Sequence, residues 1–312
     1  MTVPARRDAA IRRGSQSFAI AARLFDPPTR ALVWDLYTWC RHCDDTIDGQ
    51  HFGHAGRAAD AAAGLTTITA ATERALAGAP DPDDEAASAL ARVVAATGLP
   101  PAWPRAHLAG FAMDAAGRRY ETLDDTLDYC FHVAGVVGLM MAWVLGARTP
   151  PALARGCDLG LAFQLTNIAR DVGEDLRHGR VYVPAEFARA AGAALVPGRG
   201  LDDDTAARLV PAVTTLLGEA ERYYASAWEG LGALPARSAW AVATARRVYR
   251  DIGWVVQRRG PRAWQARAAT STPRKALRLM QALGDVAGSR GRDPGRAPRV
   301  GLWTPPLAHL AG

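Results

Sequence analysis

Lysine is almost absent from this chain. Lys275 is the only one, and arginine supplies the rest of the positive charge. Cysteine is also scarce, with Cys40, Cys43, Cys130 and Cys157 in all. Cys40 and Cys43 form a C-x-x-C, but they lie within a helical pattern and no second pair accompanies them. We therefore expect small buried residues there, not a zinc or redox site.

Several sequence signatures of other protein classes are missing. We find no Gly-rich loop after a strand, no Walker loop and no strand alternation, which argues against a nucleotide-binding α/β protein. No zinc finger or aromatic-studded basic motif is present, so we expect no nucleic-acid partner. The N-terminal residues lack the apolar core of a signal peptide. The longest apolar run, Val133 to Ala147, is shorter than the ~20 residues of a membrane span. The predicted location is the cytoplasm.

The charge that is present is positive and unevenly spread. The 312 residues carry a formal net charge of +6, and 49% of them are hydrophobic. Between Arg246 and Arg299 only Asp251, Asp285 and Asp293 oppose the arginines. Such a balance fits an anionic substrate or a membrane surface.

Apolar residues recur at helical spacing along most of the chain, which predicts an all-α protein. We expect a single helical domain over residues 1–287, because two distant acidic motifs are most simply explained as lining one cavity. Residues 288–312 are rich in Arg, Gly and Pro and are predicted to form a disordered tail. Asp114 and Arg118, four residues apart, are expected to form a structural ion pair.

Two acidic motifs end otherwise apolar helical stretches. Asp171 and Asp175 are four residues apart, as are Asp44 and Asp48, so each pair shares a helix face. Like charges at this spacing cost a helix about 0.2–0.5 kcal/mol. A few hard oxygen ligands suit Mg²⁺ better than zinc, which predicts cations between the carboxylates.

The apolar helix predicted over Tyr129 to Leu145 contains Ala134, Gly135 and Gly138. Glycine inside a helix is costly, about 1 kcal/mol relative to alanine. The small residues are consistent with close helix packing or with a groove for a long hydrocarbon.

These motifs together resemble the squalene/phytoene synthase family of head-to-head trans-isoprenyl diphosphate synthases, and within it the bacterial phytoene synthases. The resemblance spans roughly Ser15 to Lys275. It rests on Ser15–Phe18, on Tyr37–Asp48, on Tyr129–Gly138, and on Phe163–Asp175 followed by Gly179–Pro184. It implies the isoprenoid synthase fold, a helical bundle around a central cavity.

The resemblance also implies roles for individual residues. Asp44, Asp48, Asp171 and Asp175 would hold Mg²⁺, or Mn²⁺ in its place. The diphosphates would contact Ser15, Ser17, Arg41, Arg170 and Arg267. Tyr37, Gln164, Asn167, Tyr182 and Tyr249 would line the reaction cavity, and Phe18, Val133, Val137 and Gly138 the prenyl sites. Two departures are Gln16, where the family usually has Lys, and Val136, where it commonly has Thr.

The implied reaction joins two geranylgeranyl diphosphates through a cyclopropylcarbinyl diphosphate to give phytoene, the step of a 15-cis-phytoene synthase in carotenoid biosynthesis. No NADPH is expected. Peripheral contact with the inner face of the membrane and with other carotenoid enzymes follows from lipid substrates and products. The nearest alternative is a relative that uses farnesyl diphosphate to make dehydrosqualene or presqualene diphosphate. A non-catalytic helical assembly factor and a lipid-binding module are further alternatives.

Overall fold

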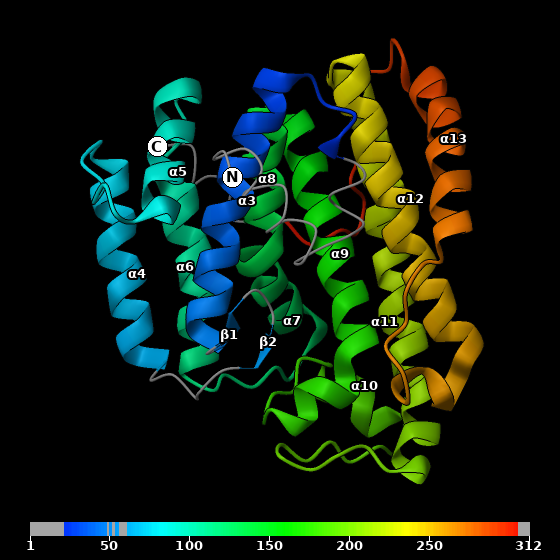
Figure 1. Cartoon of the computed structure of the whole chain (residues 1–312). Helices are drawn as coiled ribbons and strands as arrows, with labels where there is room; N and C mark the ends of the chain where they lie inside the picture. The colour runs from blue at the N-terminus through cyan, green and yellow to red at the C-terminus, as the bar shows by residue number, and fades with distance from the viewer. Residues whose placement is uncertain (1–21, 49, 52–53, 56–60, 305–312) are drawn as a thin grey trace.

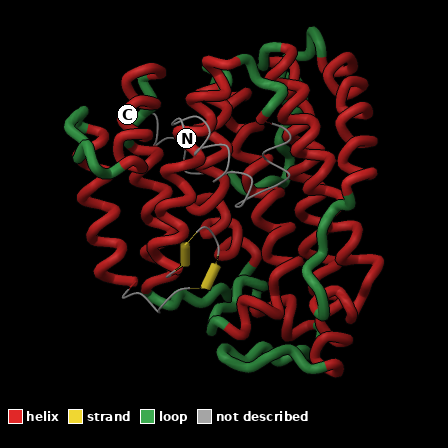
Figure 2. The backbone as a smooth tube through the Cα atoms, in the orientation of Figure 1, coloured by secondary structure: helices red, strands yellow, loops and turns green. Residues whose placement is uncertain are grey.

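Figure 1 shows the computed structural model of the chain, which describes residues 22–48, 50–51, 54–55 and 61–304. Almost all of its regular structure is helical (Figure 2). The helices are α3 (Pro27–Asp48), α4 (Ala61–Leu76), α5 (Glu85–Thr97), α6 (Ala102–Ala115), α7 (Leu123–Cys130), α8 (Val136–Val144), α9 (Pro150–Arg177), α10 (Ala185–Ala190), α11 (Asp203–Glu229), α12 (Ala236–Arg259) and α13 (Thr272–Ser289). Three short helical turns are η1 (Phe131–Gly135), η2 (Leu231–Ala233) and η3 (Gly260–Trp264), and β1 (Gln50–His51) pairs antiparallel with β2 (His54–Ala55). The all-α prediction is confirmed, with this small hairpin as an addition.

Local sequence signals set the helix starts. Thr149 caps α9 by accepting a hydrogen bond from the Ala152 N–H, and prolines occupy the first turn, where their missing N–H groups have no intrahelical acceptor. Thr122 and Asp125 form a capping box at the start of α7. The carboxylate of Asp26 accepts a hydrogen bond from the Thr29 N–H at 3.0 Å at the start of α3.

Helix α9 lies at the centre of the bundle, where α8, α11 and α12 pack against it. Its close contact with α8 depends on glycine. A Cβ atom on Gly138 would collide with the Gly156 carbonyl, and one on Gly160 with the Ala134 carbonyl. This geometry supports close helix packing as the reason for Gly138.

The apolar run of the sequence lies in a continuous helix formed by α7, η1 and α8. Within the described residues, Leu123–Val144 is the one helix long and apolar enough to cross a membrane, and 56% of the window is buried inside the bundle. We therefore assign it as a core helix. Its middle, Phe131–Gly135, is a π-helix, a widened turn that is frequent at functional sites.

Residues 288–304, which composition predicted as part of a disordered tail, make specific contacts with the bundle. The Arg299 guanidinium bonds both carboxylate oxygens of Asp158 at 2.7 and 3.0 Å, and Asp158 is fully buried. Arg155 donates to the carbonyl of Pro294 at 3.0 Å, and the Trp303 N–H donates to the Tyr223 hydroxyl at 3.1 Å. Composition alone did not reveal these charged and polar anchors.

Candidate active site

The first acidic motif is at the C-terminal end of α3. Arg41 bonds two carboxylates of its own helix, Asp44 at 3.1 Å and Asp45 one residue further on. Although burial opposes it, the charge of these carboxylates raises the pKa of Arg41. In Tyr37, by contrast, burial raises the pKa to about 12, so this hydroxyl stays protonated at neutral pH.

The second motif is near the C-terminal end of α9 and is less exposed. The Arg170 Nε donates to Asp171 Oδ1 at 2.7 Å, and Arg267 Nε lies 3.5 Å from the same oxygen. The side chain of Asp171 is 17% exposed, against 49% for Asp44. Arg267 comes from the segment between η3 and α13. Two arginines therefore converge on one carboxylate of α9.

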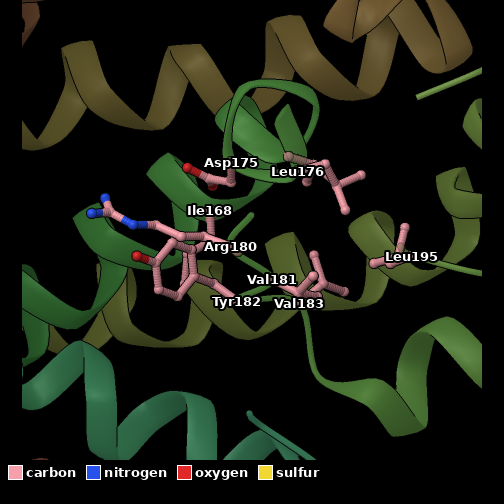
Figure 3. A pocket seen from close by; sticks show the side chains of 9 residues that line it. Ile168, Asp175, Leu176, Arg180, Val181, Tyr182, Val183 and Leu195 are labelled. Atoms are coloured by element: carbon pink, nitrogen blue, oxygen red, sulfur yellow. The ribbon is translucent and has the colours of Figure 1, made fainter. Parts of the chain in front are cut away.

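Asp175, one turn after Asp171, lines a shallow, tightly packed pocket together with Arg180 and Tyr182. Figure 3 shows the polar ends of these three side chains turned to the same side, whereas Leu176 and Leu195 turn away from it. Burial, and then the neighbouring charge of Asp171, raises the pKa of Asp175 to about 8. A buried carboxylate that is hard to ionise is a position that a cation would stabilise.

Two buried polar atoms beside these motifs lack a hydrogen-bond partner. They are Arg41 Nε, an N–H donor, and Asn167 Oδ1, an acceptor. Asn167 uses its amide nitrogen on Gln164 Oε1 at 3.3 Å. Since a buried polar group without a partner costs free energy, these atoms fit an anion oxygen and a hydrated cation respectively.

Tyr249 brings α12 to the same region. Its ring stacks on Phe163 with centroids 4.2 Å apart. Tyr249 also lies close enough to Tyr37 of α3 and Arg170 of α9 to interact electrostatically with both. The three helices thus bring predicted cavity residues into one neighbourhood.

Asp114 is a residue of this region whose role the sequence did not reveal. It accepts hydrogen bonds from Tyr182 at 2.7 Å and from Tyr129 at 3.1 Å, and the two tyrosine rings stack 4.7 Å apart. The ion pairs of Arg118 are with Asp128 and Asp125. Sequence spacing predicted a structural ion pair of Asp114 with Arg118, and only the fold reveals that Asp114 orients two tyrosine hydroxyls.

The predicted prenyl residues of the π-helix and α8 are half-buried. Val133 lies against Gly110 of α6, where a Cβ atom would come within 2.6 Å of Val133 Cγ1. Val137 packs against the core. Their roles stay predictions, as does the central cavity. Ser15, Ser17 and Phe18, and Gln16 between the two serines, lie outside the described residues, as does the side chain of Asp48.

Among the described side chains, no three or more His, Cys, Asp or Glu residues are grouped closely enough to hold a metal ion. The donors still suit Mg²⁺, because Asp44, Asp171 and Asp175 offer carboxylate oxygens and the Asn167 oxygen is unpartnered. These residues fit Mg²⁺ by the type of ligand atom that they offer.

The chain is similar to curated proteins over almost all of its length. It is 49% identical to a phytoene synthase of Pseudescherichia vulneris, covering 94% of this chain and 95% of the relative. It is 46% identical to a 15-cis-phytoene synthase of Pantoea ananas, with the same coverage of both chains.

Its fold matches that of a solved dehydrosqualene synthase in complex with ligand. The TM-score is 0.80 at 28% identity, covering 91% of this chain and 96% of the other. The squalene/phytoene synthase profile matches residues 11–275. The chain therefore belongs to the squalene/phytoene synthase family.

Proposed function

We propose that this chain is a prenyltransferase with 15-cis-phytoene synthase activity, which condenses two geranylgeranyl diphosphates head to head in carotenoid biosynthesis. The observation that carries the proposal is 49% and 46% identity to phytoene synthases over 94% of the chain. The dehydrosqualene synthase, at 28%, supports a C15 reaction less strongly. Both acidic motifs are intact, which disfavours a non-catalytic role.

The acidic motifs would hold the metal. Asp44, Asp48, Asp171 and Asp175 supply carboxylates for Mg²⁺ or Mn²⁺, which when bound neutralises diphosphate charge. Arg41 and Arg170 contribute positive charge beside these carboxylates, and Arg267 does so from a more exposed position. These arginines stabilise the leaving diphosphate as the electron pair of the C–O bond passes to oxygen. Ser15 and Ser17 are proposed as further diphosphate contacts.

The cavity side chains would control where the resulting allyl cation reacts. Its C1 adds to the double bond of the second prenyl chain, and proton loss closes the cyclopropane of the intermediate. A second ionisation, rearrangement and proton loss give phytoene without a reductant, so NADPH has no role. Phe163 and Tyr249, stacked on each other, together with Val133, Val137 and Phe18, offer apolar and aromatic surface that excludes water.

The tyrosines act as neutral, oriented groups. Burial raises the pKa of Tyr129 and Tyr182, and both hydroxyl protons are donated to Asp114. Each oxygen therefore directs its lone pairs away from Asp114, where they stabilise positive charge. A protonated tyrosine is a weak base, so released diphosphate is the better acceptor for the final proton.

Partners and location follow from the lipid chemistry. We propose a cytoplasmic enzyme in peripheral contact with the inner face of the membrane. The enzymes that supply the C20 diphosphate and consume phytoene are its expected neighbours.

The test is to incubate the purified protein and Mg²⁺ with C15 and C20 diphosphates separately and to analyse the extracted lipids. A C40 hydrocarbon from the C20 substrate, abolished by EDTA and by Asp171→Ala, supports the proposal. Asp204→Ala is the matched control, because this aspartate on α11 has a side chain that is 75% exposed and lies outside the site.

Two results would contradict the assignment. A C30 product from farnesyl diphosphate with no C40 product would establish the alternative substrate. Full turnover by both Asp44→Ala and Asp171→Ala would show that these carboxylates do not hold the metal.

A further inference from the structure

Helix α13 turns three large apolar side chains away from the protein. Leu277, Met280 and Leu283 are 51%, 62% and 42% exposed. They recur every three residues and so share one helix face. In Figure 1, α13 lies at the outer edge of the bundle, beyond α12. We call these three side chains the outer stripe.

The face of α13 that meets α12 combines ion pairs with a small apolar contact, in which Ala282 is fully buried in a cluster with Ala243 of α12. Arg278 bonds both carboxylate oxygens of Asp251 at 2.6 and 2.8 Å, and the side chain of Asp251 is 1% exposed. Asp285 accepts from Arg247 at 2.7 Å. A helix at a protein surface normally places its charges outward and its apolar residues inward. In α13 the three large apolar side chains of the outer stripe face outward instead, so ion pairs and the Ala282 contact anchor the helix while the stripe is left for another surface.

The charges around the outer stripe indicate which kind of surface the stripe binds. Arg274 and Lys275 precede it, and Arg290 follows the end of the helix. Asp285 is the sole acidic residue of α13, and it is directed inward to Arg247. An apolar stripe between basic ends, with no outward acid, is the pattern of a helix that lies in the plane of an anionic lipid surface.

A second copy of this chain fits the stripe poorly. Paired across a twofold axis, either orientation of two α13 helices brings a basic end of one against a basic end of the other, which is repulsive. A stable protein interface also takes about 20–30 residues from each partner, far more than three large side chains. Shallow insertion into lipid requires no such area.

The outer stripe is close in sequence to the acidic site. Trp264 donates to the Ala169 carbonyl of α9 at 3.0 Å, and Arg267 lies 3.5 Å from Asp171. Helix α13 begins at Thr272, a few residues later. A surface bound at α13 is thus linked to the catalytic carboxylates by one short segment, a useful arrangement for an enzyme whose substrate arrives in lipid.

We propose that the outer stripe, with the basic residues at its ends, docks this protein on the surface of an anionic lipid bilayer. This inference names the surface that makes the peripheral contact and rests on the proposed function only for its purpose. Binding itself follows from the side chains of α13.

The test is co-sedimentation of the full chain with vesicles of phosphatidylcholine alone or mixed with phosphatidylglycerol. We expect binding to the mixed vesicles, weakened at least about tenfold in the triple variant Leu277→Ser/Met280→Ser/Leu283→Ser. Arg274→Glu/Lys275→Glu should weaken it by roughly fivefold per charge and reduce its salt dependence. Val196→Ser/Val300→Ser is the matched control, since both side chains are exposed, at 49% and 78%, but lie on other segments.

Equal binding by the triple variant and the wild-type protein would overturn the proposal. So would a wild-type dimer, measured by light scattering, that the triple variant converts to monomer, because the stripe would then be a subunit interface. Turnover of C20 diphosphate in detergent is measured in parallel. Vesicle binding without turnover would refute the proposed function alone, and turnover without stripe-dependent binding would refute the docking surface alone.

Discussion

The two halves of α9 each place an aspartate in the bundle, and the fold treats these aspartates differently. Asp158, in the first half, is fully buried and accepts hydrogen bonds from Arg299 and Ser226. Asp175, in the second half, is crowded by Asp171, and its pKa is raised to about 8 by burial and that charge. An aspartate thus stabilises the fold near the start of α9, whereas near its end the charged form of an aspartate is energetically unfavourable.

This difference separates structural from functional charge. A buried carboxylate with well-placed partners is part of the packing, whereas one whose charged form the fold disfavours is a candidate for binding a cation. Natural proteins accept such local instability where activity needs it. The comparison therefore predicts opposite consequences for removing the two charges.

The largest expected effect is on catalysis and concerns Asp175, near the C-terminal end of α9. Asp175→Asn should lower turnover by about 10³-fold, roughly 4 kcal/mol in the activation barrier, because one metal-binding carboxylate is lost. The melting temperature without metal should not fall, because asparagine avoids the free-energy cost of protonating or burying this carboxyl beside Asp171. Turnover and thermal unfolding in EDTA check this. A melting temperature well below that of the wild type would mean that Asp175 is a structural residue.

For Asp158, in the first half of α9, the expected effect is on stability. Asp158→Asn should lower the free energy of unfolding by about 3 kcal/mol, because it leaves the buried Arg155 and the half-buried Arg299 short of negative charge. Turnover per folded molecule should be retained. Urea unfolding and an activity assay on the folded fraction measure both quantities.

Asp204→Asn on α11 is the control for Asp158→Asn. Its side chain is 75% exposed and pairs with Arg208 on the surface, so its loss should change the stability by no more than about 0.5 kcal/mol. If Asp158→Asn lost activity in proportion to Asp175→Asn while remaining folded, the division between the two halves of α9 would fail.

Sequence predicted the fold well because its signals are local. Periodic apolar residues predict the helices, and the caps at Thr149 and Thr122 show that helix starts are also set by neighbouring residues. The family was also predictable, since its motifs are contiguous segments, and the match over residues 11–275 confirms it.

Features that depend on contacts between distant segments were not predictable. The pairing of Arg299 with Asp158 and of Tyr182 with Asp114 joins segments far apart in the chain, and no spacing rule connects them. The direction of α13 is a similar case, because its periodicity is helical whichever face is outward. Contacts such as the ion pair of Arg278 with Asp251 and the burial of Ala282 set that direction, and they become visible only in the folded structure.

The smallest expected effect concerns a buried titratable group outside the acidic site. His107 of α6 bonds the His132 carbonyl through Nδ1 at 3.1 Å, while its Nε2 is buried without a partner. Burial lowers the pKa of His107 to about 4, below the ordinary value near 6.5. Between these pH values the unfolded chain binds a proton that the folded chain does not, so stability is complete above about pH 6.5 and falls as the pH drops toward 4.

The loss attributable to His107 should be about 1 kcal/mol at pH 5.5 relative to pH 7.5. His107→Asn keeps an N–H donor near the position of Nδ1 but cannot titrate, so it should remove this part of the pH dependence. Urea unfolding of both proteins at the two pH values measures the difference, in which the titration of every other group cancels. An identical pH dependence in the two proteins would mean that His107 is as easily protonated in the folded chain as in the unfolded one. A buried group can therefore couple stability to pH without belonging to the site, and a pKa shift indicates function only where, as at Asp175, neighbouring groups converge on it.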